Sequence, residues 1–130
     1  MNGANGGRVT VEVPRTSRYL PVVRIVAGGM VARLGISYDG LEDLQLAMDS
    51  VLAAAGPSPD PLVVAFEQSD GEDLTAALGP FSDHALHGLL TAPAARPDAP
   101  LGLSRVLASL TDGHEVDGEP DTFTVLLRKR

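Results

Sequence analysis

The stretch YDGLEDLQLAMDS, residues 38–50, carries the clearest helical signal in the chain. Its apolar side chains, and those that follow it, recur every three or four positions: Leu41, Leu44, Met48, Val51, Leu52 and Ala55. Asp39, with Glu42 three residues later, predicts a start of the capping-box type, and Gly56-Pro57 predicts the end. The spacing therefore predicts an amphipathic helix whose apolar face packs against a core.

Upstream of this helix, the pattern predicts a strand and then another helix. Residues 8–13 alternate between apolar and polar side chains and then meet a proline, which is typical of a half-buried strand. Apolar residues recur at helical spacing from Ser17, the expected cap, to Gly35, where we expect the helix to end. Gly28-Gly29 lies inside that helix and predicts a close approach of its backbone to a neighbouring element.

Downstream, the chain alternates between predicted strands and loops. A nearly continuous apolar run over residues 61–67, a turn at Asp70-Gly71 and a strand over residues 73–78 predict a hairpin. Residues 79–100 hold four of the ten prolines and predict a long lid loop with a short helical turn inside it. The remaining predicted elements are a helix from Leu103 to Leu110, a strand at residues 114–116, a turn at Asp117-Gly118 and a strand at residues 122–127.

The order of these elements predicts an α+β fold. We expect a two-layer α/β sandwich, with helices on one face of a mixed, mainly antiparallel sheet. With 130 residues, the chain is long enough for one domain and too short for two ordinary ones. We expect a flexible tail over residues 1–7 and a single domain over residues 8–130.

Composition limits the chemistry that is open to the chain. It has no cysteine, which excludes a disulfide scaffold, a thiolate zinc site and a cysteine nucleophile. The net charge of −7 argues against nucleic acid as the main partner. The sequence shows neither a targeting segment nor an apolar run of about 20 residues, so we expect a cytoplasmic protein without a membrane partner.

The charge is unevenly distributed along the chain. Residues 1–36 carry five arginines and one acid, whereas residues 37–127 carry sixteen acids and two arginines. A basic first segment on an acidic body indicates polarity between partner surfaces. Ordinary solvated chain ends are an equally open interpretation of the same distribution.

The stretch at residues 38–50 resembles the second helix of the anti-sigma-factor serine kinases, which belong to the histidine-kinase-like ATPase superfamily. The order of the surrounding elements, the segment Leu101-Gly102-Leu103 and the closing run at residues 107–112 resemble the same family. The resemblance covers roughly residues 8–128 and implies the histidine-kinase-like ATPase fold.

The resemblance also implies a catalytic pair on this helix: a Glu that acts as general base and, four residues later, an Asn that holds Mg²⁺ on ATP. Here Ser50 and Ala54 stand at these two positions. Serine does not accept a proton at neutral pH, and alanine has no oxygen for a hard cation. Asp49 is a possible substitute base, but it stands one residue early, about 100° around the helix. We therefore predict no catalytic residues.

Two further boxes of the family are altered. Its Asp-x-Gly-x-Gly motif, to which the resemblance assigns adenine recognition, is absent from residues 78–84. Its glycine-rich phosphate loop is reduced to Pro100-Leu101-Gly102-Leu103, where proline removes a backbone donor. We therefore expect no cofactor. If ATP and Mg²⁺ do bind, Gly102 and Leu103 are the expected nucleotide contacts.

Other candidate sites carry weaker signals. His84 and His87 are three residues apart, but two histidines without a third ligand favour solvated side chains over a metal site. Residues 112–118 superficially resemble a calcium loop, but oxygen ligands are missing and a hairpin turn is expected there. Ser50 and Ser104 lack the sequence context of a catalytic nucleophile. No metal site is predicted.

Two functions from different classes follow. The first is a non-catalytic regulatory binding protein that resembles an anti-sigma factor and sequesters a sigma factor or an anti-anti-sigma domain without ATP hydrolysis. The alternative is an ATP-dependent serine kinase that phosphorylates an anti-anti-sigma protein. The expected partner-binding residues are Arg18, Arg24 and Arg33, and a homodimer is possible. A scaffold module without a sigma-factor link is a third open interpretation.

Overall fold

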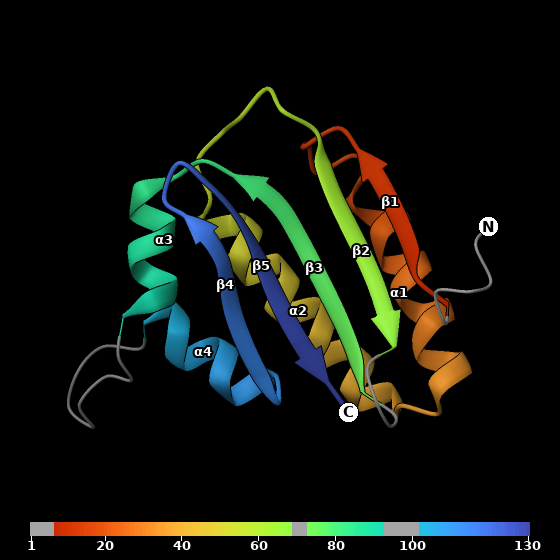
Figure 1. The fold of residues 1–130 in the computed structure, drawn as a ribbon. Coiled ribbons are helices and arrows are strands. Elements are labelled where there is room, and N and C mark those ends of the chain that lie inside the picture. The colour runs from red at the N-terminus through yellow and green to blue at the C-terminus, as the bar shows by residue number, and fades with distance from the viewer. Residues whose placement is uncertain (1–6, 69–72, 93–101) are drawn as a thin grey trace.

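Five strands and four helices build the part of the chain that the computed structural model describes, which is residues 7–68, 73–92 and 102–130 (Figure 1). In chain order they are β1 (Val9–Val13), α1 (Leu20–Leu34), α2 (Tyr38–Ala54), β2 (Leu62–Gln68), β3 (Leu74–Phe81), α3 (His84–Thr91), α4 (Leu103–Leu110), β4 (Gly113–Glu119) and β5 (Thr122–Lys129). The turn expected at Asp70-Gly71 lies outside the described residues, as do residues 1–6 of the expected tail and residues 93–101 of the expected lid loop.

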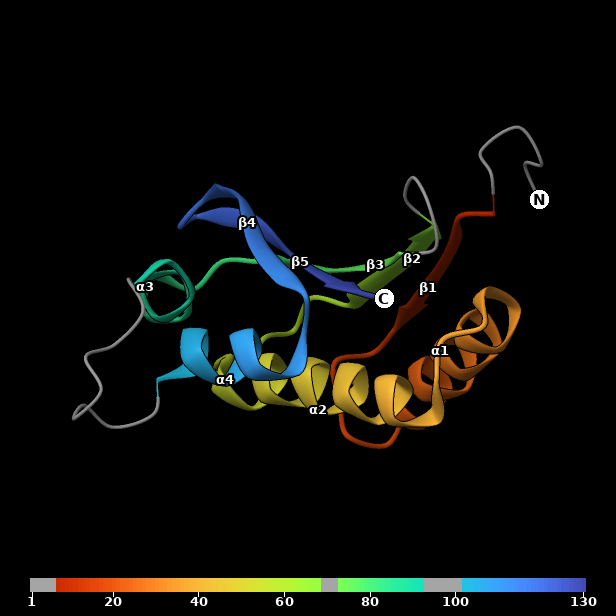
Figure 2. The same ribbon diagram turned by 90° about the horizontal axis from the view of Figure 1, so that it is seen from below.

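The strands form one sheet in the order β1-β2-β3-β5-β4. Each neighbouring pair is antiparallel, with Val11 opposite Val64 and Ala77 opposite Leu126, for example. The helices lie on one face of this sheet (Figure 2). The predicted α+β sandwich is therefore confirmed, and its sheet is antiparallel throughout the described residues.

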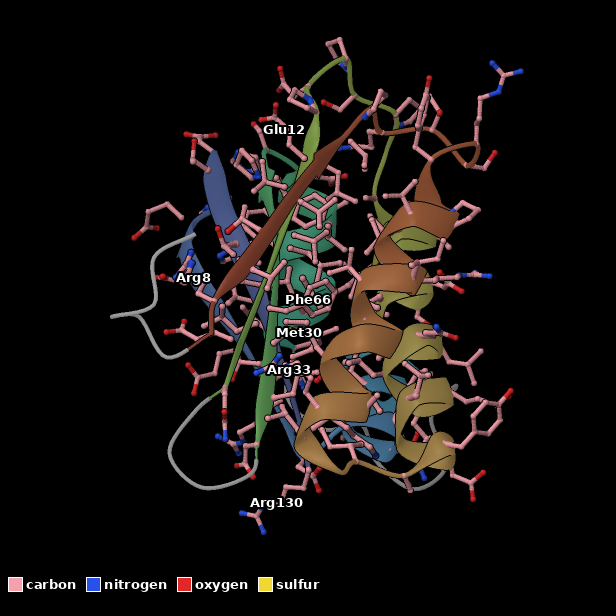
Figure 3. The ribbon with its side chains drawn as sticks, turned by 90° about the vertical axis from the view of Figure 1, so that its right-hand side faces the viewer. Arg8, Glu12, Met30, Arg33, Phe66 and Arg130 are labelled. Atoms are coloured by element: carbon pink, nitrogen blue, oxygen red, sulfur yellow. The ribbon has the colours of Figure 1, made fainter. Side chains whose placement is uncertain are left out.

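The core lies between the helical layer and the sheet. Leu44 and Val51 point inward from α2, and Phe66 and Val125 meet them from the sheet, all fully buried. Figure 3 shows Met30 of α1 facing the sheet beside Phe66 of β2. Full burial of one such side chain stabilises the fold by about 1.5–3 kcal/mol, so this shared apolar layer is what holds the helices on the sheet.

Both predicted helix caps are wrong, although both helices exist. Helix α1 begins at Leu20 with Tyr19 at its N-cap, and Ser17 does not cap it. Helix α2 is capped by Ser37, whose side-chain oxygen accepts a 3.0 Å hydrogen bond from the Gly40 backbone N–H. Ser37 has the extended backbone that an N-cap needs, whereas Asp39 already lies within the helix.

The close approach expected at the two glycines of α1 is not found. A Cβ atom on Gly28 would lie 3.9 Å from a methyl group of Leu41, which is ordinary van der Waals contact. A Cβ atom on Gly29 would meet nothing within 4 Å. Packing in the described structure therefore does not require glycine at either position.

The expected lid loop is largely regular structure. Strand β3 extends through Phe81, and helix α3 follows over His84–Thr91. The side chain of Asp83 caps this helix by accepting a hydrogen bond of 2.9 Å from the Leu86 N–H. A long loop over residues 79–100 is therefore a wrong prediction for its described part.

The turn expected at Asp117-Gly118 is also misplaced. Both residues belong to β4, and the chain turns after Glu119 instead, before β5 begins at Thr122. The residues that superficially resemble a calcium loop are therefore mostly strand and not a hairpin turn. None of the described helices combines the length and the hydropathy needed to cross a membrane.

Candidate functional site

Ser50 and Ala54, the positions at which the family resemblance implies a catalytic pair, carry no acid or amide. The hydroxyl of Ser50 donates a 2.7 Å hydrogen bond to the Leu46 carbonyl in the preceding turn of α2. Ala54 is the last residue of α2 and is exposed. This face of α2 therefore presents a hydroxyl that is already engaged and a methyl group.

Asp49, the possible substitute base, lies toward a different element. Its carboxylate is 2.6 Å from the guanidinium of Arg24 on α1. Asp49 and Ser50 differ by about 100° around α2, so an acid that meets α1 is turned away from the face of Ser50. The structure thus joins Asp49 to Arg24, a pairing that the sequence analysis did not foresee.

Leucines of α3 and α4 pack into the apolar core beside α2. Leu86 and Leu90 point inward from α3 and Leu107 points inward from α4, and all three are buried. They belong to the same buried cluster as Val51 of α2 and Phe123 of β5. Helix α3 is therefore part of the packed core.

Polar contacts fasten α3 to the turn between β4 and β5. One ring nitrogen of His84 lies 2.6 Å from the Asp121 carboxylate, and one of His87 lies 3.2 Å from the Gly118 carbonyl oxygen. The His87 ring also meets Phe123 edge-on, with centroids 5.1 Å apart. His84 thus contacts this turn and His87 contacts the end of β4. No group of three or more metal-ligating side chains occurs in the described ranges.

Asp83 connects α3 to the end of α2, and the sequence analysis missed this role. Its carboxylate accepts hydrogen bonds of 2.9 Å from the backbone N–H groups of Gly56 and Leu86. These two bonds, that from Gly56 first, hold the pKa of Asp83 below its usual value because they stabilise the charged form. An Asp directly before a short apolar helix was the available signal.

The expected nucleotide contacts lie at the start of α4. Gly102 is the exposed N-cap, and its carbonyl accepts from the Val106 N–H at 3.0 Å. Leu103 packs partly against the core, while Pro100 and Leu101 lie outside the described residues. Ser50 and Ala54 supply neither the acid nor the amide that the family resemblance implies at these positions.

The predicted partner-binding arginines occupy different environments. Arg18 and Arg33 are exposed at opposite ends of α1, whereas Arg24 is half-exposed in its ion pair with Asp49. Two large apolar side chains also face solvent on α1: Val22 is 43% exposed and Ile25 is 75% exposed. Helix α1 therefore presents apolar and basic groups together on its outer side.

Arg15, which the sequence groups with the basic residues of the first helix, lies before α1 and makes structural contacts with other segments. One terminal nitrogen donates to the carbonyl oxygens of Pro80 at 2.8 Å and Pro61 at 3.2 Å, and its guanidinium lies 4.9 Å from the Phe81 ring centre. Its Nε atom is buried without a hydrogen-bond partner. Burial lowers the pKa of Arg15, and the charge of Asp60 opposes that shift.

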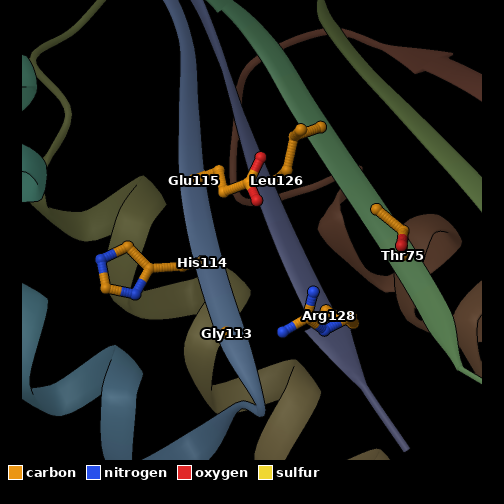
Figure 4. A pocket seen from close by; sticks show the side chains of 6 residues that line it. All are labelled: Thr75, Gly113, His114, Glu115, Leu126 and Arg128. Carbon is orange, nitrogen blue, oxygen red and sulfur yellow. The ribbon is translucent and has the colours of Figure 1, made fainter.

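A small pocket lies on the sheet where β3, β5 and β4 meet (Figure 4). Its volume is about 160 Å³, below the range of about 300–1,000 Å³ that is typical of ligand pockets. Arg128 points into it and donates a 3.1 Å hydrogen bond to the Asp112 carbonyl. Because of this size, the pocket does not suit a nucleotide.

Comparisons with known proteins add to this geometry. No family model matches the chain. It is 25% identical over 81 residues to the serine-protein kinase RsbW of Oceanobacillus iheyensis, and 24% identical over 79 residues to that of Bacillus subtilis. These matches cover 62% and 61% of this chain and 48% and 46% of the two relatives, so the chain spans about half the length of the curated relatives it matches.

The fold comparison covers more of the chain. A crystal structure of the RsbU and RsbW domains of Rv1364c from Mycobacterium tuberculosis matches 95% of this chain and 32% of that one, with a TM-score of 0.67 and 15% sequence identity. At this identity the match shows the fold alone. In sequence and in fold, the chain is therefore similar to RsbW proteins, with the histidine-kinase-like ATPase architecture that residues 38–50 indicate.

Proposed function

We propose that this protein is a non-catalytic regulator that resembles an anti-sigma factor and sequesters a sigma factor or an anti-anti-sigma domain without ATP hydrolysis. The observation that carries the proposal is the side-chain content of one face of α2. Ser50 and Ala54 provide no general base and no Mg²⁺ ligand there, while Asp49 is held by Arg24 on another side of the helix.

The arrangement of α3 supports the same proposal. A nucleotide site needs space and polar donors, whereas α3, whose N-cap Asp83 bonds to Gly56 just after α2, contributes the buried apolar side chains of Leu86 and Leu90 to the core. Opening that region would expose these leucines to water, at a free-energy cost of about 1.5–3 kcal/mol for each fully buried side chain.

The outer side of α1 is the proposed partner surface. Helix α1 packs Val23 and Ala27 into the core. Its opposite face exposes two further apolar side chains, Val22 and Ile25, to solvent. Exposed apolar groups flanked by cations suit a partner surface with apolar and acidic side chains. Arg18 and Arg33 supply the cations at the two ends of this surface.

The test is affinity purification of the full chain from its native cells without added nucleotide, followed by mass spectrometry. A sigma factor or an anti-anti-sigma domain should be recovered. Ile25→Ser should reduce its recovery, while Leu89→Ser on α3, where the leucine is 46% exposed, is the matched control and should not. Recovery of neither kind of partner, or equal recovery with both variants, contradicts the proposal.

The alternative is an ATP-dependent serine kinase that phosphorylates an anti-anti-sigma protein, and the name of the curated relatives favours it. In that case Mg²⁺ and ATP must bind, and phosphate must pass to a serine of the protein partner. Incubation of the full chain with the recovered partner and labelled ATP separates the two functions. Label on the partner that disappears with Asp49→Asn would establish the kinase, with Asp49 in the catalytic machinery.

A further inference from the structure

A cavity of about 420 Å³ lies where the first turns of α1 meet the last turn of α2. The two helices pack side by side on one face of the sheet (Figure 2). The volume falls within the range of about 300–1,000 Å³ that is typical of small-molecule pockets. None of its lining residues comes from α3 or α4, so it is separate from the region of the expected nucleotide site.

The lining of this cavity carries more basic than acidic residues. It includes two arginines, Arg15 and Arg24, and one acid, Asp49. The Arg15 guanidinium is engaged with the Pro61 and Pro80 carbonyls and interacts with the charge of Asp60, so it is not the free group of this cavity. Arg24 is paired with Asp49 through one contact of 2.6 Å, and an arginine has five N–H donors. Arg24 therefore keeps donors for a ligand with one negative charge.

The remaining walls are of two kinds. Leu20 of α1 and Leu52 and Ala53 of α2 provide an apolar wall, and Thr16 and Ser17 provide hydroxyl groups beside the arginines. A pocket with a largely apolar wall and a few convergent polar groups binds ligands that have an apolar body and a polar head. A carboxylate can accept two parallel hydrogen bonds from a guanidinium group, whereas a neutral amide offers one acceptor oxygen.

We propose that this cavity binds a small amphiphilic monocarboxylate, with Arg24 as the partner of the carboxylate group and Leu20 and Leu52 against the apolar body. The site lies outside the altered nucleotide region and does not depend on a protein partner. Its ligand shares Arg24 with Asp49, so removal of the Asp49 charge should strengthen binding.

The experiment is a titration of the ¹⁵N-labelled full chain, followed by backbone amide shifts in NMR spectra. Hexanoate is the probe, and hexanamide is its uncharged control of equal size. Hexanoate should shift the amides of Ser17, Leu20, Ala53 and Gly56 to saturation, with a Kd of about 1 mM or tighter. Hexanamide should bind at least about tenfold more weakly, because it offers no charge to Arg24.

Variants identify the site. Arg24→Gln should weaken hexanoate binding at least about tenfold, and Asp49→Asn should strengthen it. Arg8→Gln is the matched control, since it also breaks a half-exposed Arg–acid pair, that with Glu67 at 3.4 Å, but lies outside the cavity. Ala53→Leu should abolish binding by filling the cavity while it leaves every charge in place.

The results separate the proposal from its competitors. Equal binding of hexanoate and hexanamide would show that the site does not recognise a carboxylate. Shifts that persist in both Arg24→Gln and Ala53→Leu would show that hexanoate binds outside this cavity. Absence of saturable shifts overturns the site altogether. None of these results bears on whether the protein sequesters a transcription regulator, because the titration contains no partner protein.

Discussion

The two flanks of α2 differ in how completely they are closed. On one flank, α4 packs against α2 and α3 lies beyond it (Figure 2). Helix α3 is fastened there by buried leucines, by a capping aspartate and by two histidines that reach Gly118 of β4 and Asp121 of the following turn. On the other flank, α1 keeps Val22 and Ile25 in solvent and leaves a cavity beside α2. This difference is the reason why we propose both binding surfaces on the α1 side of α2.

The closed flank should be broken most severely by Leu86→Ala. Leu86 is fully buried, and loss of a buried leucine side chain costs about 2–5 kcal/mol in the free energy of unfolding. Leu89 lies on the same helix and is 46% exposed, so Leu89→Ala should change stability by less than about 0.5 kcal/mol. Urea denaturation measures both. Similar values for the two variants would mean that α3 is not packed as described.

Gly118→Ala should disturb the same flank through the strand that His87 contacts. Gly118 has a φ of 123°, and a Cβ atom there would lie 2.4 Å from the Thr122 carbonyl oxygen. Side chains are rarely tolerated in this backbone region, and the strain costs on the order of 1–3 kcal/mol. Thermal unfolding should show a lower Tm. An unchanged Tm would contradict the β4–β5 geometry that fastens α3.

On the open flank, Gly29→Ala should raise the stability of the protein, whereas the two substitutions above lower it. Gly29 lies in the middle of α1, and a Cβ atom there has nothing within 4 Å. Replacement of glycine by alanine inside a helix should therefore stabilise the protein, by up to about 1 kcal/mol. Urea denaturation tests this. Loss of stability would show that something in solution packs against this face of α1, such as a second copy of the chain.

The link that Asp83 makes between α3 and the end of α2 should weaken in acid. The pKa of Asp83 is lowered in the folded state, so its contribution to stability is present above its unfolded pKa of about 3.9 and is lost as the pH falls through the lower folded value. Asp83→Asn removes this charge. The difference in unfolding free energy between wild type and Asp83→Asn should shrink as the pH falls below about 4. A difference that does not change with pH would contradict this role.

The effect of Asp83→Asn should be the smallest of the four, because solvent screens a half-buried carboxylate. The variant also separates charge from capping, since asparagine is as good an N-cap as aspartate. Asp83→Ala, which loses both, should therefore destabilise the protein more than Asp83→Asn does at neutral pH.

Local patterns were sufficient for most of the fold. The apolar spacing around Leu44 and Val51 predicts α2 because a helix repeats every 3.6 residues whatever surrounds it. The start of α2 was misjudged because Ser37 and Asp39 both favour caps, and only the backbone angles decide between them. Helix α3 was underestimated because eight residues flanked by prolines give a weak periodic signal.

The candidate site was predicted less well, for a physical reason. The replacements at Ser50 and Ala54 are visible in the sequence, because they depend only on the register of one helix. The partner of Asp49 is 25 residues away on α1, and Asp83 bonds to a backbone group 27 residues away. Arg15 reaches a carbonyl at a separation of 65 residues. Such contacts depend on the tertiary arrangement, so no periodic pattern of residues in the sequence predicts them.

The central claim is that this fold operates without nucleotide, and calorimetric titration of the full chain with ATP in the presence of Mg²⁺ tests it most directly. Ser50 and Ala54 supply no carboxylate or amide oxygen for Mg²⁺. We predict no binding with a Kd tighter than about 1 mM. Saturable binding in the micromolar range would contradict the account and restore the kinase as the leading function.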